Sequence, residues 1–421
     1  MRFNQLFFLL VVVAVSSCKR QAISTITPLS GVLSQSTCLS IKKNVPSASL
    51  ERSLVKTITV PLNPEVYNFP DYIESYQYVR LETTPQSLIG NIDKLCSDLS
   101  LFFIFDKENN HVLCFSNKGQ FLHKIGSKGR GPGEYIKIED ISVDYNKHQL
   151  CLLDLNGGKQ LFYNYEGKLL YEQPLYYYYH QLEFLGNKEV LLTSYAHNEG
   201  YPAIDSHRLI LATRNQAPLW RAFSYPSQLR ENFHWEYAHP LSSYNGHVFF
   251  HYILSDTIWE ITDHRCIARY VLKFPGRKPL YDIRKLNLLS DNDFSFNMHK
   301  NSFFEGNYVQ NKNMFTFFIT DKGPAITPLF YSKISGKVLY GFAFSKSMNS
   351  FLAKIMCNQP DYVAADNSLI KVLQPFDIFR ILKFSEKTHQ KVLMSSKDKE
   401  LLRNMKEEDN PVLLVVKMKT F

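Results

Sequence analysis

From about Val55 to the end of the chain, apolar and polar residues alternate in short runs that end at turn residues. The clearest unit extends from Ile92 to Gly126 and contains the runs IDKLCS, LFFIFD, HVLCFS and FLHKIG. Alternation with a period of two predicts half-buried β-strands, and the turn Asn117–Gln120 is typical of a hairpin. This unit is therefore predicted to be a four-stranded antiparallel sheet.

The next unit repeats the pattern with the runs IEDISVD, QLCLLD, KQLFYNYEG and KLLYEQPL. Asp154 follows Asp106 by 48 residues, and Gly167 follows Gly119 by the same 48 residues. Repeats of this length are typical of propellers and solenoids. Weaker copies cover His180–Phe223, Pro240–Phe274, Asn307–Phe344 and the chain from Ser350 onward, where FLAKIMC and DYVAAD are predicted strands. The chain is thus predicted to hold about six four-stranded units.

Strand patterns also stand at both ends of this region, at Lys56–Val60 and Pro411–Met418. A propeller must tie its ends together, because an open ring leaves unpaired edges and an uncovered blade face. Ser385–Asp409 is charged with sparse leucines and predicts one or two surface helices, and Tyr281–Lys300 predicts a helical or loop insertion. The predicted fold is all-β: a six-bladed β-propeller closed by N- and C-terminal strands, with a short helical segment near the C-terminus.

The composition fits this fold and excludes other classes. The 421 residues are 45% hydrophobic and 21% charged, which excludes a disordered chain, and 25 Tyr with 31 Phe suit pleated surfaces. No run of about 18 apolar residues follows the first fifteen positions, which excludes a polytopic membrane protein. Length alone would suggest two or three domains, but the repeat predicts one ring. Cys96, Cys114 and Cys151 stand in apolar runs without CxxC spacing, which is typical of buried thiols.

The first 18 residues predict export. Arg2 precedes the apolar stretch Leu6–Val15, as in a secretion signal. Val15–Cys18 resembles the bacterial lipobox, so Cys18 is the predicted lipidation site; a plain signal peptide with an incidental cysteine is the alternative. Residues 19–54 are predicted to be a flexible tether, and residues 55–421 a single propeller domain. The formal net charge of +9 comes without a basic cluster interleaved with aromatics, so no nucleic-acid binding is predicted. The chain is also predicted to be a monomer.

Several segments resemble one protein family. Tyr72–Gly90, Ile125–Tyr135 with the following Asp140, and Asp409–Val412 are similar to a large family of six-bladed β-propeller lipoproteins of Gram-negative, gut-type anaerobes, related in architecture to NHL-repeat propellers. The resemblance implies fold and envelope location more than activity. Surface-exposed lipoproteins of such bacteria carry acidic residues after the lipidated cysteine, whereas Lys19–Gln21 follow here. This difference favours an anchor that faces the periplasm.

The glycine-rich segment Gly126–Tyr135 is the most distinctive candidate for a site. Its spacing matches neither the dinucleotide nor the P-loop motif. It is predicted to join the outermost strand of one blade to the innermost strand of the next, crossing a face toward the central channel, and that role alone explains its glycines and Pro132. The residues that a turn does not require are the candidate ligand contacts Lys128, Arg130, Glu134 and Tyr135.

The turns between the second and third strands of the first two units are predicted to emerge on the same face. They would place Asp106, Asn109, Asp154 and Asn156 around one channel mouth, the usual ligand position of a ring fold. The alternative is that Asp106 and Asp154 only cap their turns through backbone N–H groups.

Other polar clusters carry weaker signals. Tyr176–His180 fits a sugar-stacking platform, but strand packing also accounts for most of its tyrosines. A set of histidines with one tryptophan matches no metal-ligand spacing, so neither a metal nor a cofactor is predicted; its members are His234, Trp235, His239, His247 and His251.

No catalytic residue is predicted, because the chain lacks a Gly-x-Ser-x-Gly elbow and a recognisable carboxylate pair. The predicted function is a non-catalytic module of the cell envelope that binds a protein or glycan through one propeller face. A propeller glycan hydrolase or lyase is the alternative.

Overall fold

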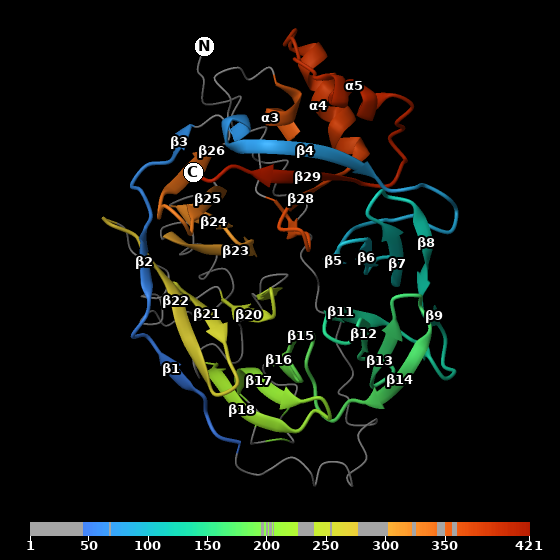
Figure 1. The fold of residues 1–421 in the computed structure, drawn as a ribbon, viewed down its shortest axis with the longest axis vertical. Helices are drawn as coiled ribbons and strands as arrows, with labels where there is room; N and C mark the ends of the chain where they lie inside the picture. The colour runs from blue at the N-terminus through green and yellow to red at the C-terminus, as the bar shows by residue number, and fades with distance from the viewer. Residues whose placement is uncertain are drawn as a thin grey trace, which may run out of the picture.

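The computed structural model describes residues 45–66, 69–194, 198, 201, 204, 206–225, 240–252, 255–276, 302–321, 326–342, 350–355 and 360–421. The predicted signal peptide, Cys18, the insertion at residues 281–300, and His234, Trp235 and His239 lie outside these residues. Within them the strands form six blades around a common axis (Figure 1), so the predicted six-bladed propeller is confirmed.

Each of the first three blades is a four-stranded antiparallel sheet whose strands follow one another from the innermost to the outermost. The first blade contains β5 (Lys94–Ser97), β6 (Leu101–Asp106), β7 (His111–Ser116) and β8 (Phe121–Ile125). The second contains β11 (Ile138–Asp144), β12 (Gln149–Asp154), β13 (Lys159–Asn164) and β14 (Leu169–Pro174). The third contains β15 (Gln181–Leu185), β16 (Lys188–Leu192), β17 (His207–Thr213) and β18 (Pro218–Ser224).

Strands from the N-terminal region pair with each of the other three blades. In the fourth and fifth blades they are short additional strands, described below, and in the sixth blade the N-terminal strand is β4. The fourth contains β19 (Leu241–Tyr244), β20 (His247–Phe250), β21 (Thr257–Ile261) and β22 (Arg265–Lys273). The fifth contains β23 (Ser302–Gln310), β24 (Met314–Asp321), β25 (Ile326–Ser332) and β26 (Val338–Phe342). The sixth contains β27 (Tyr362–Val363), β28 (Leu369–Leu373), β29 (Val412–Met418) and β4 (Ile73–Arg80).

The ring closes in the sixth blade, where β29 pairs antiparallel with β4 and Val412 lies opposite Arg80. Closure by N- and C-terminal strands is thus confirmed, but the N-terminal partner is Ile73–Arg80 and not the predicted strand at Lys56–Val60. Both segments have strand patterns, and the sequence alone cannot state which of them meets β29.

The earlier strand belongs to a belt along the outside of the ring. Ser47 pairs with Arg221 of β18, and β1 (Ser49–Glu51) and β2 (Lys56–Thr59) lie parallel to β22. The strand β3 (Glu65–Val66) then pairs with β26. We call residues 45–66 the N-terminal belt; it is the blue segment on the left of Figure 1. Residues 45–51 were predicted to belong to a flexible tether, but they pair with blade edges that would otherwise be open.

The hydrophobic core is divided among the blade interfaces. Six clusters of buried side chains occur in the described residues, and each cluster combines residues of two neighbouring blades. The largest fully buried side chains are all Tyr or Phe, such as Phe103, Tyr163 and Phe317. The aromatic excess of the composition is therefore concentrated between the blades, where flat side chains fill the space between sheets.

The helices lie beside the closing blade, outside β4 (Figure 1). They are α4 (Pro375–Lys387) and α5 (Ser396–Leu402), preceded in the chain by η3 (Phe69–Tyr72) and α3 (Phe351–Ile355). A short helical segment near the C-terminus is thus confirmed, although α4 begins ten residues before the predicted Ser385, with Pro375 in its first turn. No helix among the described residues is long and apolar enough to span a bilayer.

The run FLAKI was predicted to be a strand, and α3 corrects this prediction. Phe351, Leu352 and Ile355 are buried together in the cluster between the fifth and sixth blades. Spacings of one and four residues fall on one side of a helix, and a five-residue apolar run cannot distinguish the two structures by periodicity. A second difference concerns the fifth blade, where the strand β25 was not among the predicted strands.

Candidate functional site

The glycine-rich segment between the first and second blades forms a compact loop around its own glutamate. Its short strands β9 (Ser127–Lys128) and β10 (Glu134–Tyr135) pair in parallel, and the Glu134 carboxylate accepts a hydrogen bond from Gly131 N at 2.8 Å. A Cβ at Gly129 would overlap that carboxylate, so a larger residue there would displace the Glu134 side chain from its present position. Glu134 therefore holds the loop in shape.

This loop lies at the outer rim of the ring and not at the channel mouth. Gly133 O accepts a hydrogen bond from the Tyr163 hydroxyl of β13 at 2.6 Å, and Gly133 N donates to Glu172 of β14 at 3.2 Å. Lys128 and Arg130 are exposed there, and no hydrogen bond or ion pair joins their side chains to any described residue. The crossing toward the channel begins only after Tyr135.

Tyr135 differs from the other candidates because it is part of the core. Its side chain is 3% exposed and packs in the cluster between the first and second blades. Burial raises the pKa of its hydroxyl to about 12. In this structure its ring does not reach the solvent.

Asp106 is fully buried at the end of β6 and holds two chain segments together. Its carboxylate accepts hydrogen bonds from Asn109 N at 3.0 Å and from Gly90 N, in the crossing that enters the first blade, at 2.7 Å. His111 Nε2 lies 3.5 Å from the same carboxylate. Burial alone would raise the pKa of Asp106, but the hydrogen bonds from His111, Asn109 and Gly90 outweigh it and lower the pKa to about 2.

Asp154 occupies the equivalent position in the second blade. It accepts from Gly157 N at 2.8 Å in its own turn, and from Ile136 N at 2.7 Å and Lys137 N at 3.1 Å in the incoming crossing. Both aspartates therefore cap turns, as the alternative interpretation expects, and they also fix the crossings to the same face. Asn109 and Asn156 stand exposed in these two turns.

The innermost strands of the first three blades meet at a buried charged cluster that the sequence did not reveal. Lys94 Nζ of β5 lies 3.0 Å from Asp140 Oδ1 of β11 and 3.0 Å from Glu183 Oε1 of β15. Ser142 Oγ donates to Glu183 Oε2 at 3.1 Å, and Leu182 N donates to Asp140 Oδ2 at 3.0 Å. Every carboxylate oxygen is thus engaged within the fold.

The pKa values of this cluster follow from burial and pairing. Burial lowers the pKa of Lys94, but Asp140 and Glu183 outweigh it, so the pKa is raised above its usual value. Burial raises the pKa of Asp140, and Lys94 opposes the shift. The sequence carried one sign of this cluster, because the first run of each of three successive units contains a charged residue.

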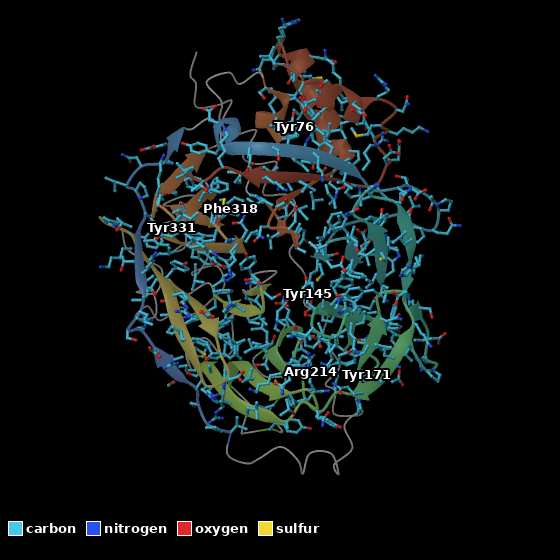
Figure 2. The ribbon with its side chains drawn as sticks, in the orientation of Figure 1. Tyr76, Tyr145, Tyr171, Arg214, Phe318 and Tyr331 are labelled. Carbon is cyan, nitrogen blue, oxygen red and sulfur yellow. The ribbon has the colours of Figure 1, made fainter. Side chains whose placement is uncertain are left out.

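Tyr145, just after β11, lies near the centre of the ring (Figure 2).

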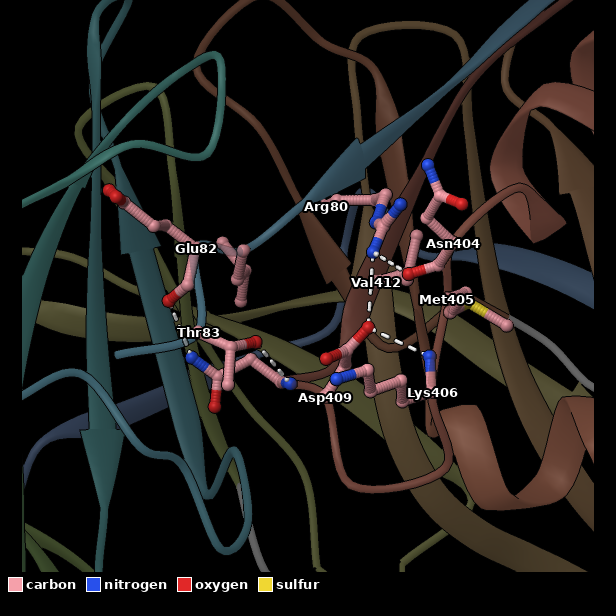
Figure 3. Close-up of a pocket in the computed structure, with 10 residues that line it drawn as sticks. Arg80, Glu82, Thr83, Asn404, Met405, Lys406, Asp409 and Val412 are labelled. Atoms are coloured by element: carbon pink, nitrogen blue, oxygen red, sulfur yellow. Dashed lines mark hydrogen bonds and ion pairs between the residues drawn. The ribbon is translucent and has the colours of Figure 1, made fainter. Parts of the chain in front are cut away.

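A polar pocket of about 330 Å³ lies where the ring closes (Figure 3). Asn410 is one of the residues that line it: Nδ2 donates to Glu82 O at 2.8 Å and to Ser87 O at 2.7 Å, and Oδ1 accepts from Ile89 N at 2.9 Å. Asn410 N donates to Thr83 Oγ1 at 2.9 Å. We call this set of bonds the Asn410 clasp, because it fastens the crossing out of β4 to the chain that enters β29.

Arg80 and Asp409 form a second link across the same pocket. Arg80 Nη2 lies 3.0 Å from Asp409 Oδ2, and Nη1 donates to Arg403 O at 3.1 Å. Lys406 N also donates to Asp409 Oδ2, at 2.9 Å. The segments that resemble the lipoprotein propellers, Tyr72–Gly90 and Asp409–Val412, therefore meet at this closure.

With this geometry in view, the comparisons with known proteins identify the family. The family described as “Domain of unknown function (DUF4934)” matches residues 55–417. The chain belongs to this family. No curated protein sequence matches it.

A solved structure with a high similarity score shares the fold of this DUF4934 member. A protein of Bacteroides fragilis NCTC 9343 named as an exported protein has a TM-score of 0.70 and 17% identity, over 87% of this chain and 99% of that chain. A member of the DUF4221 family from Bacteroides vulgatus ATCC 8482 has a TM-score of 0.48 and 11% identity, over 83% and 98% of the two chains. At 17% identity the first likeness concerns the fold alone.

The remaining aromatic and histidine candidates of this DUF4934 member have structural contacts. Tyr177, Tyr178 and Tyr179 are buried between the second and third blades, as strand packing requires. His247 Nδ1 lies 2.5 Å from Glu260 Oε1. The described residues contain no group of three or more His, Cys, Asp or Glu side chains that could hold a metal ion.

Proposed function

We propose that this chain is an exported lipoprotein of the cell envelope that binds a protein or glycan through one propeller face, without catalysis. Cys18 would carry the lipid and the anchor would face the periplasm. The signal-like first 18 residues and the lipobox-like Val15–Cys18 support export and lipidation. Multiple acyl chains at one cysteine would supply stable attachment, since a single chain binds a membrane only marginally.

The observation that carries the binding proposal is the rim loop that presents Lys128 and Arg130. The loop is held by Glu134 and by contacts from β13 and β14, so its shape is fixed before any partner arrives. Its two cations stand exposed and uncommitted among the described residues. Preorganised groups bind with less loss of conformational entropy, and cations favour a partner with acidic groups.

The charged cluster of the channel favours binding over the alternative of glycan hydrolysis. Glycosidases use two carboxyl groups about 5–10 Å apart that remain free to transfer protons or attack the sugar. Asp140 and Glu183 do lie close together, but both are bonded to Lys94 and their other oxygens accept from Leu182 N and Ser142. A pair engaged in this way is suited to joining blades.

The binding proposal is tested by Lys128→Ala combined with Arg130→Ala. We expect the double variant to unfold at the same temperature as the wild type, because neither side chain has a partner among the described residues. It should lose the proteins or glycans that the immobilised wild-type chain captures from an envelope extract. Lys391→Ala with Lys399→Ala removes two exposed lysines elsewhere and should leave capture intact. Equal capture by the wild type and the Lys128/Arg130 variant would contradict the proposal.

A further inference from the structure

The outer edges of the first two blades are open in the part of the chain that the structure describes. There β8 pairs only with β7, and β14 pairs only with β13. The outermost strands of the other four blades are covered by the N-terminal belt or by Lys397 of α5. Figure 1 shows β8 and β14 on the right side of the ring, away from the belt. An open edge offers unpaired backbone N–H and C=O groups to another strand.

The edge of β14 is the more accessible of the two. The strand β8 is in contact with the second blade, because His123 Nε2 lies 2.9 Å from Tyr165 O. In contrast, β14 exposes four of its six residues, including Leu170 at 43% and Tyr171 at 40%. These two side chains place apolar surface beside the open backbone of β14.

The backbone of β14 presents hydrogen-bonding groups outward. Leu175 N, just after this strand, donates to Gly158 O at 2.8 Å, so Leu175 faces β13. In an antiparallel ladder every second residue turns its N–H and C=O toward the partner strand. Gln173 therefore also faces β13, whereas Glu172 and Pro174 turn their backbone groups outward. Proline is typical of this outward position, because it has no N–H to leave unpaired.

The fold already accepts short added strands at equivalent edges. The strands β1, β2 and β3 of the N-terminal belt are two to four residues long, and they lie parallel to the outermost strands β22 and β26. The strand β14 is six residues long. An extended segment of the same length as a belt strand therefore fits along β14.

The exposed charges around β14 are mainly positive. The rim loop contacts this strand through Glu172, whose carboxylate is already engaged in an ion pair, and it presents Lys128 and Arg130. Lys168 is exposed just before β14. We call Lys128, Arg130 and Lys168 the basic rim; none of the three has a hydrogen-bond or ion-pair partner among the described residues. The exposed Glu166 offsets one of these charges, so the area stays positive.

This charge selects the occupant of the edge. The chain's own residues 19–44 carry four cations and no carboxylate; the cations are Lys19, Arg20, Lys42 and Lys43. A second copy of the chain would bring the same basic rim against this one. Both occupants would place like charges together, whereas a segment with acidic side chains would be attracted.

We propose that β14 receives an extended, acidic segment of a partner protein as an added strand. The backbone of this segment bonds to the outward groups of Glu172 and to Pro174 O. Its apolar side chains pack on Leu170 and Tyr171, and its carboxylates face the basic rim. This mode of binding rests on the function proposed for the rim loop, and it makes the partner a protein instead of a glycan.

The test measures the binding of labelled peptides to the full chain by fluorescence anisotropy. The probe is a short peptide of alternating valine and glutamate with blocked ends. The same peptide N-methylated at three consecutive central residues cannot donate from either edge, and a valine–lysine peptide reverses the charge. Leu170→Glu changes an exposed leucine of β14. Leu122→Glu is the matched control, because Leu122 is an equally exposed leucine of β8, at 46%.

We expect the glutamate peptide to bind the wild type and Leu122→Glu equally. It should bind Leu170→Glu at least tenfold more weakly, because that variant loses an apolar contact and adds a like charge. The N-methylated peptide should bind the wild type at least tenfold more weakly, the effect of two lost main-chain hydrogen bonds. The lysine peptide should not bind. Both variants should unfold at the same temperature as the wild type.

Several outcomes would overturn strand addition at β14: no binding of the glutamate peptide, equal binding of its N-methylated form, or equal binding by the two leucine variants. Binding only to a chain that begins at residue 45 would assign the edge to residues 19–44, and a dimer that Leu170→Glu dissociates would assign it to a second copy. If N-methylation has no effect but Lys128→Ala with Arg130→Ala abolishes binding, strand addition is wrong and the rim-loop function stands.

Discussion

Single residues in this propeller act mainly by joining segments that are distant in sequence. Asp106 and Asp154 each bind their own turn and the crossing that precedes their blade, and Asn410 binds the crossing out of β4. Buried polar side chains that satisfy several backbone groups are costly to remove, because each lost bond leaves a buried donor or acceptor unpaired. Lys94 joins three blades in the same manner through two carboxylates.

The repeat in the sequence was enough to select Asp106 and Asp154 but not to state what they contact. Their spacing marked them as equivalent, and the turn after each favoured a cap. The partners Gly90 and Ile136 lie in the preceding crossings, and only the folded ring brings them near. The contacts of Lys94 with Asp140 and Glu183 likewise require three blades to meet, so no local pattern could predict them.

Glu189 is a buried carboxyl group at the junction of the second and third blades. Its Oε2 accepts from Gln160 Nε2 at 3.3 Å, while Oε1 has no partner among the described residues. Arg214, labelled beside Tyr171 in Figure 2, pairs with Asp144 nearby. Burial raises the pKa of Glu189 from its usual 4.5 to about 8, against the opposing effects of Gln160 and Arg214. The group is therefore neutral in the folded protein at pH 7.

This raised pKa predicts a pH dependence of stability. The unfolded chain ionises Glu189 above its usual pKa of 4.5, whereas the folded chain keeps the proton until about pH 8. The free energy of unfolding should thus fall as pH rises between these values, by roughly 1.4 kcal/mol per pH unit from this group. Glu189→Gln removes the titration and keeps the shape, so urea unfolding at pH 5.5 and 8 should show a smaller loss for the variant. An identical loss in both proteins would contradict the assigned pKa.

At the scale of elements, the main addition to the blades is the N-terminal belt. Three blades have their outermost strands covered by it: β18 by Ser47, β22 by β1 and β2, and β26 by β3. The edge of β4 is covered differently, by two residues of α5. Lys397 Nζ donates to Tyr76 O at 2.8 Å, and Asp398 accepts a hydrogen bond from the Tyr78 hydroxyl at 2.7 Å. Covered edges do not pair with other chains.

The strands inside blades could be predicted from sequence, whereas their edge partners could not. Alternation and turn residues are signals that extend over only about ten residues of sequence, so they were enough to predict all four strands of the first blade. The belt pairs residues that are about 200 positions apart, such as Ser49 with Arg265, and its short strands carry little alternation. The closing strand was misassigned for the same reason, since Lys56–Thr59 and Ile73–Arg80 look alike locally and differ only in their distant partners.

The belt should contribute to both stability and solubility. We expect a chain that begins at residue 67 to have a lower free energy of unfolding, because it lacks the belt residues Ile58 and Val60, which are 1% and 0% exposed and pack in the core between the fourth and fifth blades. The same truncation leaves the edges of β22 and β26 open. The truncated chain should also associate, which light scattering at increasing concentration would detect. A chain that begins at residue 45 is the control. Equal stability and a monomeric state for both chains would show that the belt is dispensable.

At the scale of the whole molecule, stability depends on how the ring is closed. Each blade contributes to two of the six core clusters, so opening the ring between the first and sixth blades would expose the cluster that contains Phe115 and Leu413. Two connections prevent this: the β4–β29 ladder within the sixth blade, and the Asn410 clasp between that blade and the crossing to the first. The ladder consists of repeated backbone bonds, but the clasp relies on one side chain.

Asn410→Ala should therefore weaken the whole ring more than its single amide would suggest. The variant leaves Glu82 O, Ser87 O and Ile89 N without their partner, and we expect the free energy of unfolding to fall by about 2–4 kcal/mol. Asn117→Ala, which removes one exposed bond to Leu99 O, should cost less than about 1 kcal/mol. Both values follow from urea unfolding. If the Asn410 clasp helps to close the ring, hydrogen exchange in Asn410→Ala should increase first in β4 and β29. An increase confined to residues 404–410 would show that the β4–β29 ladder closes the ring alone.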